Sequence, residues 1–155
     1  MKILVQVFSF LIFLSLTANT HAQENVSLLK ESVQQWNKWR EKNPGAISDF
    51  RGAILRGANL QGANLFMSDL RGASLQGANL RFANLHNANL QKTDLQDTNL
   101  QNSSFRGAKN LSCNQVNSVK SLDQDTKFPN YLEVKITGEN QWTCKELKEK
   151  IEKQE

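Results

Sequence analysis

The sequence contains few of the residue types from which enzymes and metal proteins build their sites. Its 155 residues include two histidines, His21 and His86, and two cysteines, Cys113 and Cys144. Cysteine, histidine and carboxylate residues do not fall at the spacing of a metal site. No candidate nucleophile has a base and an orienting group beside it. The sequence therefore predicts no catalytic residue, no metal and no cofactor, and it does not indicate an enzyme.

A strong charge of either sign is also missing. The chain has 19 lysine and arginine residues against 15 aspartate and glutamate residues, a net charge of +4, and both signs are spread along it. It thus carries no basic tract suited to nucleic acid and no acidic tract. Glycine recurs at a fixed interval, so matches to phosphate-binding glycine motifs are by-products of a repeat. We expect no nucleic-acid partner.

The one long apolar run lies at the N-terminus. Lys2 precedes a mostly apolar segment, residues 3–16, and Thr20 and Ala22 place small residues at the −3 and −1 positions of a cleavage site. This pattern predicts a secretory signal peptide over residues 1–22 and export to a periplasm, a lumen or the extracellular space. The alternative is an uncleaved membrane anchor, but the apolar run falls short of the ~20 residues that span a bilayer. We expect no membrane span after cleavage.

What the chain has in abundance is a five-residue repeat. A large apolar residue recurs at every fifth position, a small residue stands two positions before it, and mostly Asn or Asp lies between them. The twelve large residues are Phe50, Leu55, Leu60, Leu65, Leu70, Leu75, Leu80, Leu85, Leu90, Leu95, Leu100 and Phe105. A period of five fits neither a helix nor a strand. Glycines this frequent would also cost a helix roughly 1 kcal/mol each.

A chain that turns a corner every five residues explains the pattern. Four such sides close a square coil of 20 residues, and successive coils would stack about 4.8 Å apart through parallel backbone hydrogen bonds. No single repeat can bury its apolar face alone, so neighbouring repeats must stack. The sequence therefore predicts a solenoid of about three coils over residues 45–108, with the twelve large residues in its interior.

The repeats also resemble a known family. GANLQGANL at 57–65, RGASLQGANLRFANLHNANL at 71–90 and TDLQDTNL at 93–100 are similar to the pentapeptide-repeat proteins, whose motif is A(D/N)LXX. The resemblance covers about sixty residues, with departures at Ile54 and Ser74, which replace Asn or Asp. It implies an all-β solenoid, a right-handed quadrilateral β-helix.

Three functions stay open for such a chain. The first is an exported, non-enzymatic scaffold that binds an unknown protein or envelope component through a rigid surface. The second follows from the resemblance, since some family members imitate duplex DNA and occupy a topoisomerase. That mimicry needs a strongly negative surface in the cytoplasm, which the weakly basic repeats and the predicted export disfavour. The third is recognition of a glycan or ice lattice, for which a ladder of Asn59, Asn79 and Asn99 is the only hint.

A helix is expected between the signal peptide and the repeats, over residues 23–44. Val26, Leu29, Val33 and Trp36 line one apolar face, and Asn-Pro-Gly at 43–45 ends the helix. The open end of a β-helix exposes unpaired backbone groups and interior leucines, so this helix is predicted to cap the first coil. As an alternative, Trp36 and Trp39 could contact a membrane or a sugar.

A second cap is expected over residues 109–155. Ser112 can begin a short helix, residues 132–137 alternate as a strand, and residues 138–140 form a turn. Thr143 and Glu146 have the spacing of a capping box, which predicts a final helix from residue 144 to about 152.

The two cysteines lie in the part of the chain predicted to be exported. As an even pair in an oxidising compartment, Cys113 and Cys144 are predicted to form a disulfide. Closing their loop would contribute roughly 3 to 4 kcal/mol to the free energy of unfolding. Two buried thiols are the alternative.

The outward positions of the coils supply the candidate interaction surface. Arg51 and Arg71 would stack in one ladder, and Phe66, Met67 and Phe82 are apolar where other outward residues are polar or glycine. Exposed apolar residues can mark a partner site. Alternatively, the C-terminal segment covers these three residues within the same molecule. Nothing in the sequence indicates a dimer.

Overall fold

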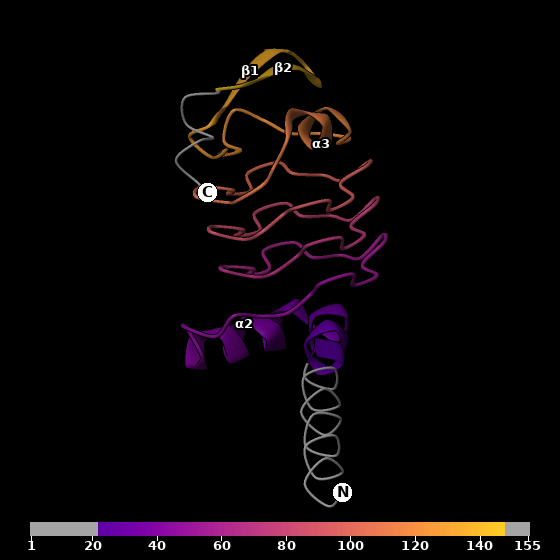
Figure 1. Cartoon of the computed structure of the whole chain (residues 1–155). Coiled ribbons are helices and arrows are strands. Elements are labelled where there is room, and N and C mark those ends of the chain that lie inside the picture. Colours follow the sequence, from indigo (N-terminus) through magenta and orange to yellow (C-terminus); the bar gives the residue numbers. More distant parts are fainter. Residues whose placement is uncertain (1–21, 148–155) are drawn as a thin grey trace, which may run out of the picture.

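The computed structural model describes residues 22–147, so residues 1–21 of the predicted signal peptide and most of the predicted C-terminal helix lie outside the described residues. Residues 22–31 are helical and are followed by α2 (Val33–Lys42), α3 (Cys113–Asn117), β1 (Leu132–Gly138) and β2 (Gln141–Glu146). Figure 1 shows stacked turns of chain between α2 at one end and the β1–β2 hairpin at the other. No helix of the described segment is both long and apolar enough to cross a membrane.

The stacked turns are square coils of 20 residues. Parallel bridges join Asp49 to Asp69, Asp69 to Asn89 and Asn89 to Lys109, each pair 20 residues apart. Every large residue of the repeat is no more than 1% exposed, and together they form one continuous core. The five-residue period therefore places its large apolar residues in the interior, where neighbouring coils pack them against one another.

Two local features recur at the corners. The second corner residue adopts the left-handed conformation, which glycine enters without steric penalty, as at Gly52 with φ of 63°. The Asn or Asp of the repeat accepts a hydrogen bond from the backbone N–H two residues later, as Asn99 does from Gln101 at 3.1 Å. This side-chain turn explains the preference for Asn or Asp, which the sequence pattern alone left unexplained.

The N-terminal helix is broken where a single helix was expected. Ser32 interrupts it and caps α2 by accepting a hydrogen bond from the backbone N–H of Gln35. A serine side chain that satisfies a free N–H favours a helix start over a helix interior. The predicted end of the helix is confirmed, because α2 ends at Lys42 with Asn43 as its C-cap.

α2 supplies hydrogen bonds to the edge of the first coil. The Trp36 indole N–H donates to the carbonyl oxygen of Asn64 at 2.9 Å, and the Asn37 amide accepts from the N–H of Asn64 and donates to the carbonyl of Gly62. Trp36 is fully buried with an edge-on contact to Phe50, so it is not available to a membrane or a sugar. Trp39 is partly buried and stacks on Trp36.

At the other end, the chain after the last coil continues the stacking. Asn99 bridges to Ser121 and Ser104 bridges to Lys127. Ser112 caps α3 in a reciprocal capping box with Gln115, which confirms the predicted helix start. The strand expected at 132–137 is confirmed as β1.

The helix predicted from residue 144 is wrong in its first turn. Thr143 and Cys144 lie in β2, where Cys144 pairs with Val134 of β1. The Glu146 carboxylate accepts from the backbone N–H of Cys113 at 2.9 Å, so it does not complete a capping box with Thr143. Cross-strand pairing therefore outweighs a short local helix signal.

The disulfide joins α3 to β2. Cys113 and Cys144 are bonded with their Cα atoms 5.5 Å apart, and the described segment has no free cysteine. The hairpin is thus tied covalently to the short helix that follows the last coil.

Candidate interaction surface

The two ladder arginines each form an ion pair with an aspartate of the same repeat. Arg51 donates from Nε and Nη2 to Asp49 at 2.9 and 2.7 Å, and Arg71 donates from Nε and Nη2 to Asp69 at 2.8 and 2.6 Å. Arg51 Nε also lies 3.8 Å from the carboxylate of Asp69 in the next coil. The ladder is therefore a row of alternating charges whose net charge is zero.

These pairings perturb the ionisation of all four groups. Hydrogen bonds from Arg51 and Arg71 hold the pKa of Asp49 and of Asp69 below the ordinary aspartate value, and the same bonds raise the pKa of each arginine. The pairs are exposed to solvent, which limits their contribution to stability. Each guanidinium commits two of its nitrogens to its own aspartate, so a partner carboxylate would have to compete or bind the remaining nitrogen.

Phe66, Met67 and Phe82 do not form a single patch. Met67 donates its N–H to the carbonyl of His86 and Phe82 donates to that of Gln101, so they lie on two different corners. Phe66 and Met67 are partly buried, and Phe66 contacts the His86 ring edge-on at 5.8 Å. The three candidates thus separate into a partly covered corner and the corner that carries Phe82.

Phe82 is the exposed member, with 51% of its surface accessible. The aromatic residues of the C-terminal segment pack elsewhere: Phe128 stacks on Phe105, and the Tyr131 hydroxyl donates to the carbonyl of Ala108. The expectation that this segment covers the apolar residues is therefore wrong for Phe82. The guanidinium of Arg81 lies over the Phe82 ring, 5.3 Å from its centre.

The backbone at Phe82 is strained. Its φ is 59°, in the left-handed region that glycine occupies at corners such as Gly52 and that Met67 and Lys92 also adopt. A bulky aromatic residue with positive φ is an outlier, since its Cβ crowds the backbone. Strain of this kind is kept where surrounding structure or function requires the side chain.

The asparagine ladder is largely occupied by its own repeat. The Asn79 amide donates to the Oδ1 atom of Asn59 at 3.1 Å, and Asn79 and Asn99 each accept a backbone N–H at their own corner. These oxygens are therefore already used in holding the corners together. A lattice of water or sugar would find fewer free groups here than the sequence pattern indicates.

One buried charge was not expected from the sequence. Arg40 of α2 is 1% exposed, donates to the carbonyls of Ala46 and Phe66 and to the hydroxyl of Ser48, and has no acidic partner in the described residues. Burial lowers its pKa. The sequence around Arg40 gave no signal of this role, because its acceptors lie outside α2, at Ala46, Ser48 and Phe66. Residues 22–147 hold no group of three potential metal ligands.

The comparisons with known proteins agree on the repeats. The family model described as pentapeptide repeats matches in eight copies, over residues 48–72 and 68–107. No curated protein matches the chain.

Several solved structures are similar to the chain. A pentapeptide repeat protein (Rfr23) from the cyanobacterium Cyanothece 51142 is 36% identical over 52% of this chain and 53% of its own, with a TM-score of 0.46. A pentapeptide repeat protein from Nostoc PCC 7120 is 30% identical over 63% and 87% of the two chains, with a TM-score of 0.34. QnrB1, a plasmid-mediated fluoroquinolone resistance protein, is 20% identical over 54% and 39%, with a TM-score of 0.45. The chain spans about half the length of the first of these relatives.

Proposed function

The chain belongs to the pentapeptide-repeat family, and from that premise we propose that it is an exported, non-enzymatic scaffold. Its fold is the quadrilateral β-helix of that family, right-handed, with α2 capping one end and the α3–hairpin unit capping the other. The rod would bind a protein or another component of the cell envelope through an outward corner. Such a role requires no reactive group, only a rigid and complementary surface.

The observation that carries this proposal is the exposed, strained Phe82. A glycine at this corner would relieve the left-handed backbone, yet the chain presents an aromatic ring with an arginine over it. Aromatic and arginine side chains are the residues most enriched at the energetic centres of protein interfaces. We therefore place the centre of the interaction surface on the corner of Arg81 and Phe82, ahead of the paired Arg51 and Arg71.

A pull-down from an envelope fraction tests the proposal. Phe82→Gly should reduce capture of the partner while leaving the rod folded. The matched control is Lys92→Gly, which relieves the same backbone conformation on another corner, where φ is 57°. Capture should be unchanged in this control. If Phe82→Gly and Lys92→Gly captured the partner equally well, Phe82 would not belong to the interaction surface.

The arginine ladder is tested in the same assay. Changing Arg51 and Arg71 together to Ser should weaken capture mainly at low salt, if the ladder steers a charged partner. Substrate turnover by the pure protein that is lost on changing His86 or Asp94 would contradict a scaffold function altogether.

The DNA-mimic alternative has little support in the charges of the coils. Residues 45–108 contain six basic and four acidic side chains, and two of the acids are paired with arginines. A surface that imitates the phosphates of DNA needs an excess of negative charge. Inhibition of a topoisomerase by the purified protein would reverse this preference.

Export is the part of the proposal that rests on residues 1–22. The disulfide between Cys113 and Cys144 supports it, because such bonds persist in oxidising compartments and are rare in the cytosol. Mass spectrometry of the protein from its native source should find an N-terminus near Gln23. A soluble cytoplasmic form that retains Met1 would contradict export and reopen the DNA-mimic alternative.

A further inference from the structure

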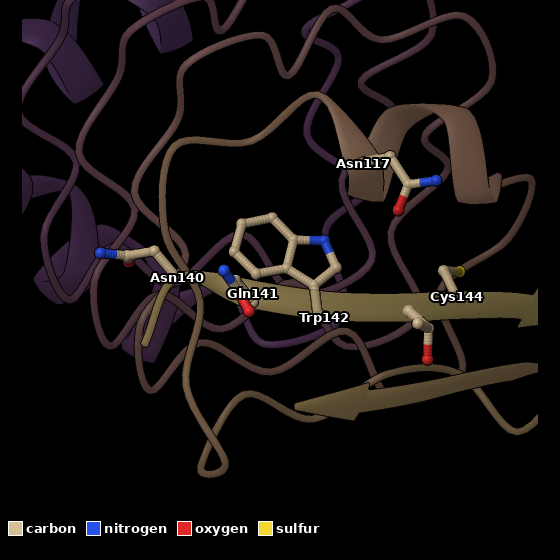
Figure 2. Close-up of a pocket in the computed structure, with 6 residues that line it drawn as sticks. Asn117, Asn140, Gln141, Trp142 and Cys144 are labelled. Atoms are coloured by element: carbon tan, nitrogen blue, oxygen red, sulfur yellow. The ribbon is translucent and has the colours of Figure 1, made fainter. Parts of the chain in front are cut away.

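A hollow of about 540 Å³ lies between α3 and β2, away from the corners of the coils. Figure 2 shows the Trp142 indole in this hollow, with its nitrogen edge turned towards Asn117 and with Asn140 and Gln141 at the opposite side. The residues that line it are Asn117, Asn140, Gln141, Trp142, Thr143 and Cys144. The hollow is shallow and open to solvent.

Covalent and polar links hold the two walls of the hollow in place. The disulfide ties Cys113 of α3 to Cys144 of β2, two residues from Trp142, so both inward-facing residues of this strand lie towards α3. The Cys113 N–H also donates to the carboxylate of Glu146 at 2.9 Å. The site is therefore preorganised, which lowers the entropy lost when a ligand binds.

The lining combines one aromatic ring with neutral hydrogen-bonding groups. It has no charged side chain. Trp142 packs partly against the core and lines the hollow with its remaining surface. None of the side-chain hydrogen bonds found within residues 22–147 uses the amides of Asn117, Asn140 or Gln141, or the indole N–H. Three amides, each with donors and an acceptor, are thus free to bind a ligand within this part of the chain.

These groups select against several ligand classes. The lining offers no counter-charge to an ionic ligand, so a neutral ligand fits better, and a ligand that covers both Trp142 and the amides needs an apolar face beside hydrogen-bonding groups. A sugar ring meets both requirements, because its C–H face packs on an indole while its hydroxyls exchange hydrogen bonds with amides. We propose that this hollow binds a neutral oligosaccharide, with Trp142 as the stacking platform and Asn117 as a hydrogen-bonding residue.

This site is separate from the Phe82 corner and does not depend on the scaffold function. A scaffold with both surfaces would hold a protein on its coils and a glycan at its C-terminal end. Loss of either activity can be measured without the other.

Calorimetric titration of the disulfide-intact protein tests the proposal. The probes are chitotetraose, cellotetraose and maltotetraose as neutral oligosaccharides, and a heparin-derived tetrasaccharide as the acidic comparison. At least one neutral probe should bind saturably and perturb tryptophan fluorescence. The acidic probe should bind more weakly.

Variants locate the binding. Trp142→Ala should lower the affinity about tenfold or more, because it removes the stacking face. Ile54→Ala is the control, since it removes an exposed apolar side chain on the coils, away from the hollow, and should leave the affinity unchanged. Asn117→Ala lies on α3, outside the β1–β2 pairing, and should weaken binding several-fold even if Trp142→Ala disturbs the hairpin.

Three results would overturn the proposal. The first is that no neutral probe binds saturably, and the second is that the acidic probe binds more strongly than the neutral ones. The third is that the Asn117→Ala variant and the Trp142→Ala variant are both folded and both bind with the affinity of the parent. Reduction of the disulfide offers a further check, since it should lower the affinity while circular dichroism shows that the coils remain folded.

Discussion

Arg40 donates a hydrogen bond from Nη2 to the carbonyl oxygen of Phe66 at 2.8 Å, and so joins α2 to the first coil. The same guanidinium binds the carbonyl of Ala46 and the hydroxyl of Ser48. It also lies beside the rings of Trp36 and Trp39. In the middle of the rod such carbonyls accept hydrogen bonds from the neighbouring coil. At this end no coil precedes the first one within the described residues, and the buried Arg40 side chain supplies the donors instead.

Replacing Arg40 should detach this end of the rod. Arg40→Ala leaves two partly buried carbonyls without their donor and removes a fully buried side chain, and we expect the free energy of unfolding to fall by about 3 kcal/mol. Arg40→Lys should recover only part of the loss, because an ammonium lacks the planar fork of a guanidinium. Urea unfolding measures both changes. Equal stability of the Ala variant and the parent would mean that water replaces these bonds.

The interior of the coils should not accept charge. Leu80→Asp places a carboxylate in a fully buried position with no partner, and we expect a loss of several kcal/mol. Gln76→Glu, on an outward corner, should change stability by less than about 0.5 kcal/mol. Thermal unfolding distinguishes them. The assignment of inward and outward positions would be wrong if Gln76→Glu were the more damaging change.

The strained corner makes stability and binding move in opposite directions. Phe82→Gly removes the crowding of a Cβ atom at a φ of 59° and should stabilise the rod by roughly 1 kcal/mol. Lys92→Gly should stabilise it similarly. Chemical denaturation of both variants gives the comparison. A destabilised Phe82→Gly would indicate that the ring, through its contact with Arg81, contributes more packing energy than its backbone strain removes.

The paired charges predict a weak dependence of stability on pH. The folded-state pKa of Asp49 and Asp69 lies below the ordinary 3.8, so the stabilisation is present above pH ~4 and is lost as the pH falls through the lower folded value. Because both arginines are exposed to solvent, the contribution of each pair is small. The parent should therefore exceed the Arg51→Ser, Arg71→Ser double variant slightly at pH 7 and match it near pH 2. A difference that persists at pH 2 would come from packing of the arginine stems.

Loss of the disulfide should affect the C-terminal end first. The bond closes a loop with a sequence separation of 31, and its reduction should lower the free energy of unfolding by about 3 kcal/mol. Hydrogen exchange of the reduced protein should accelerate in β1 and β2 before it accelerates in the coils. Uniform acceleration along the whole chain would mean that the hairpin and the coils unfold as one unit.

The repeat, its period and the inward positions from Phe50 to Phe105 were predictable from the amino-acid sequence alone. This was possible because each repeat contacts its neighbours in the chain and the repeats 20 residues away in the adjacent coils. Every repeat therefore shows the same pattern of inward and outward residues. The capping role of Ser112 and the strand at residues 132–137 were also predictable, since each depends on near neighbours in the chain.

Features that depend on residues far apart in sequence could not be predicted in this way. Cys144 lies in a strand because Val134 pairs with it and Glu146 binds the N–H of Cys113, which outweighs the local helix signal. Arg40 is buried because its acceptors belong to the first coil. Phe82 remains exposed because the aromatic residues of the C-terminal segment pack on the last coil. There Phe128 stacks on Phe105, and Tyr131 donates to the carbonyl of Ala108. Local patterns therefore predict the rod. The structure of its two ends and of its surface depends on residues distant in sequence, which bond the polar groups there and cover the apolar side chains.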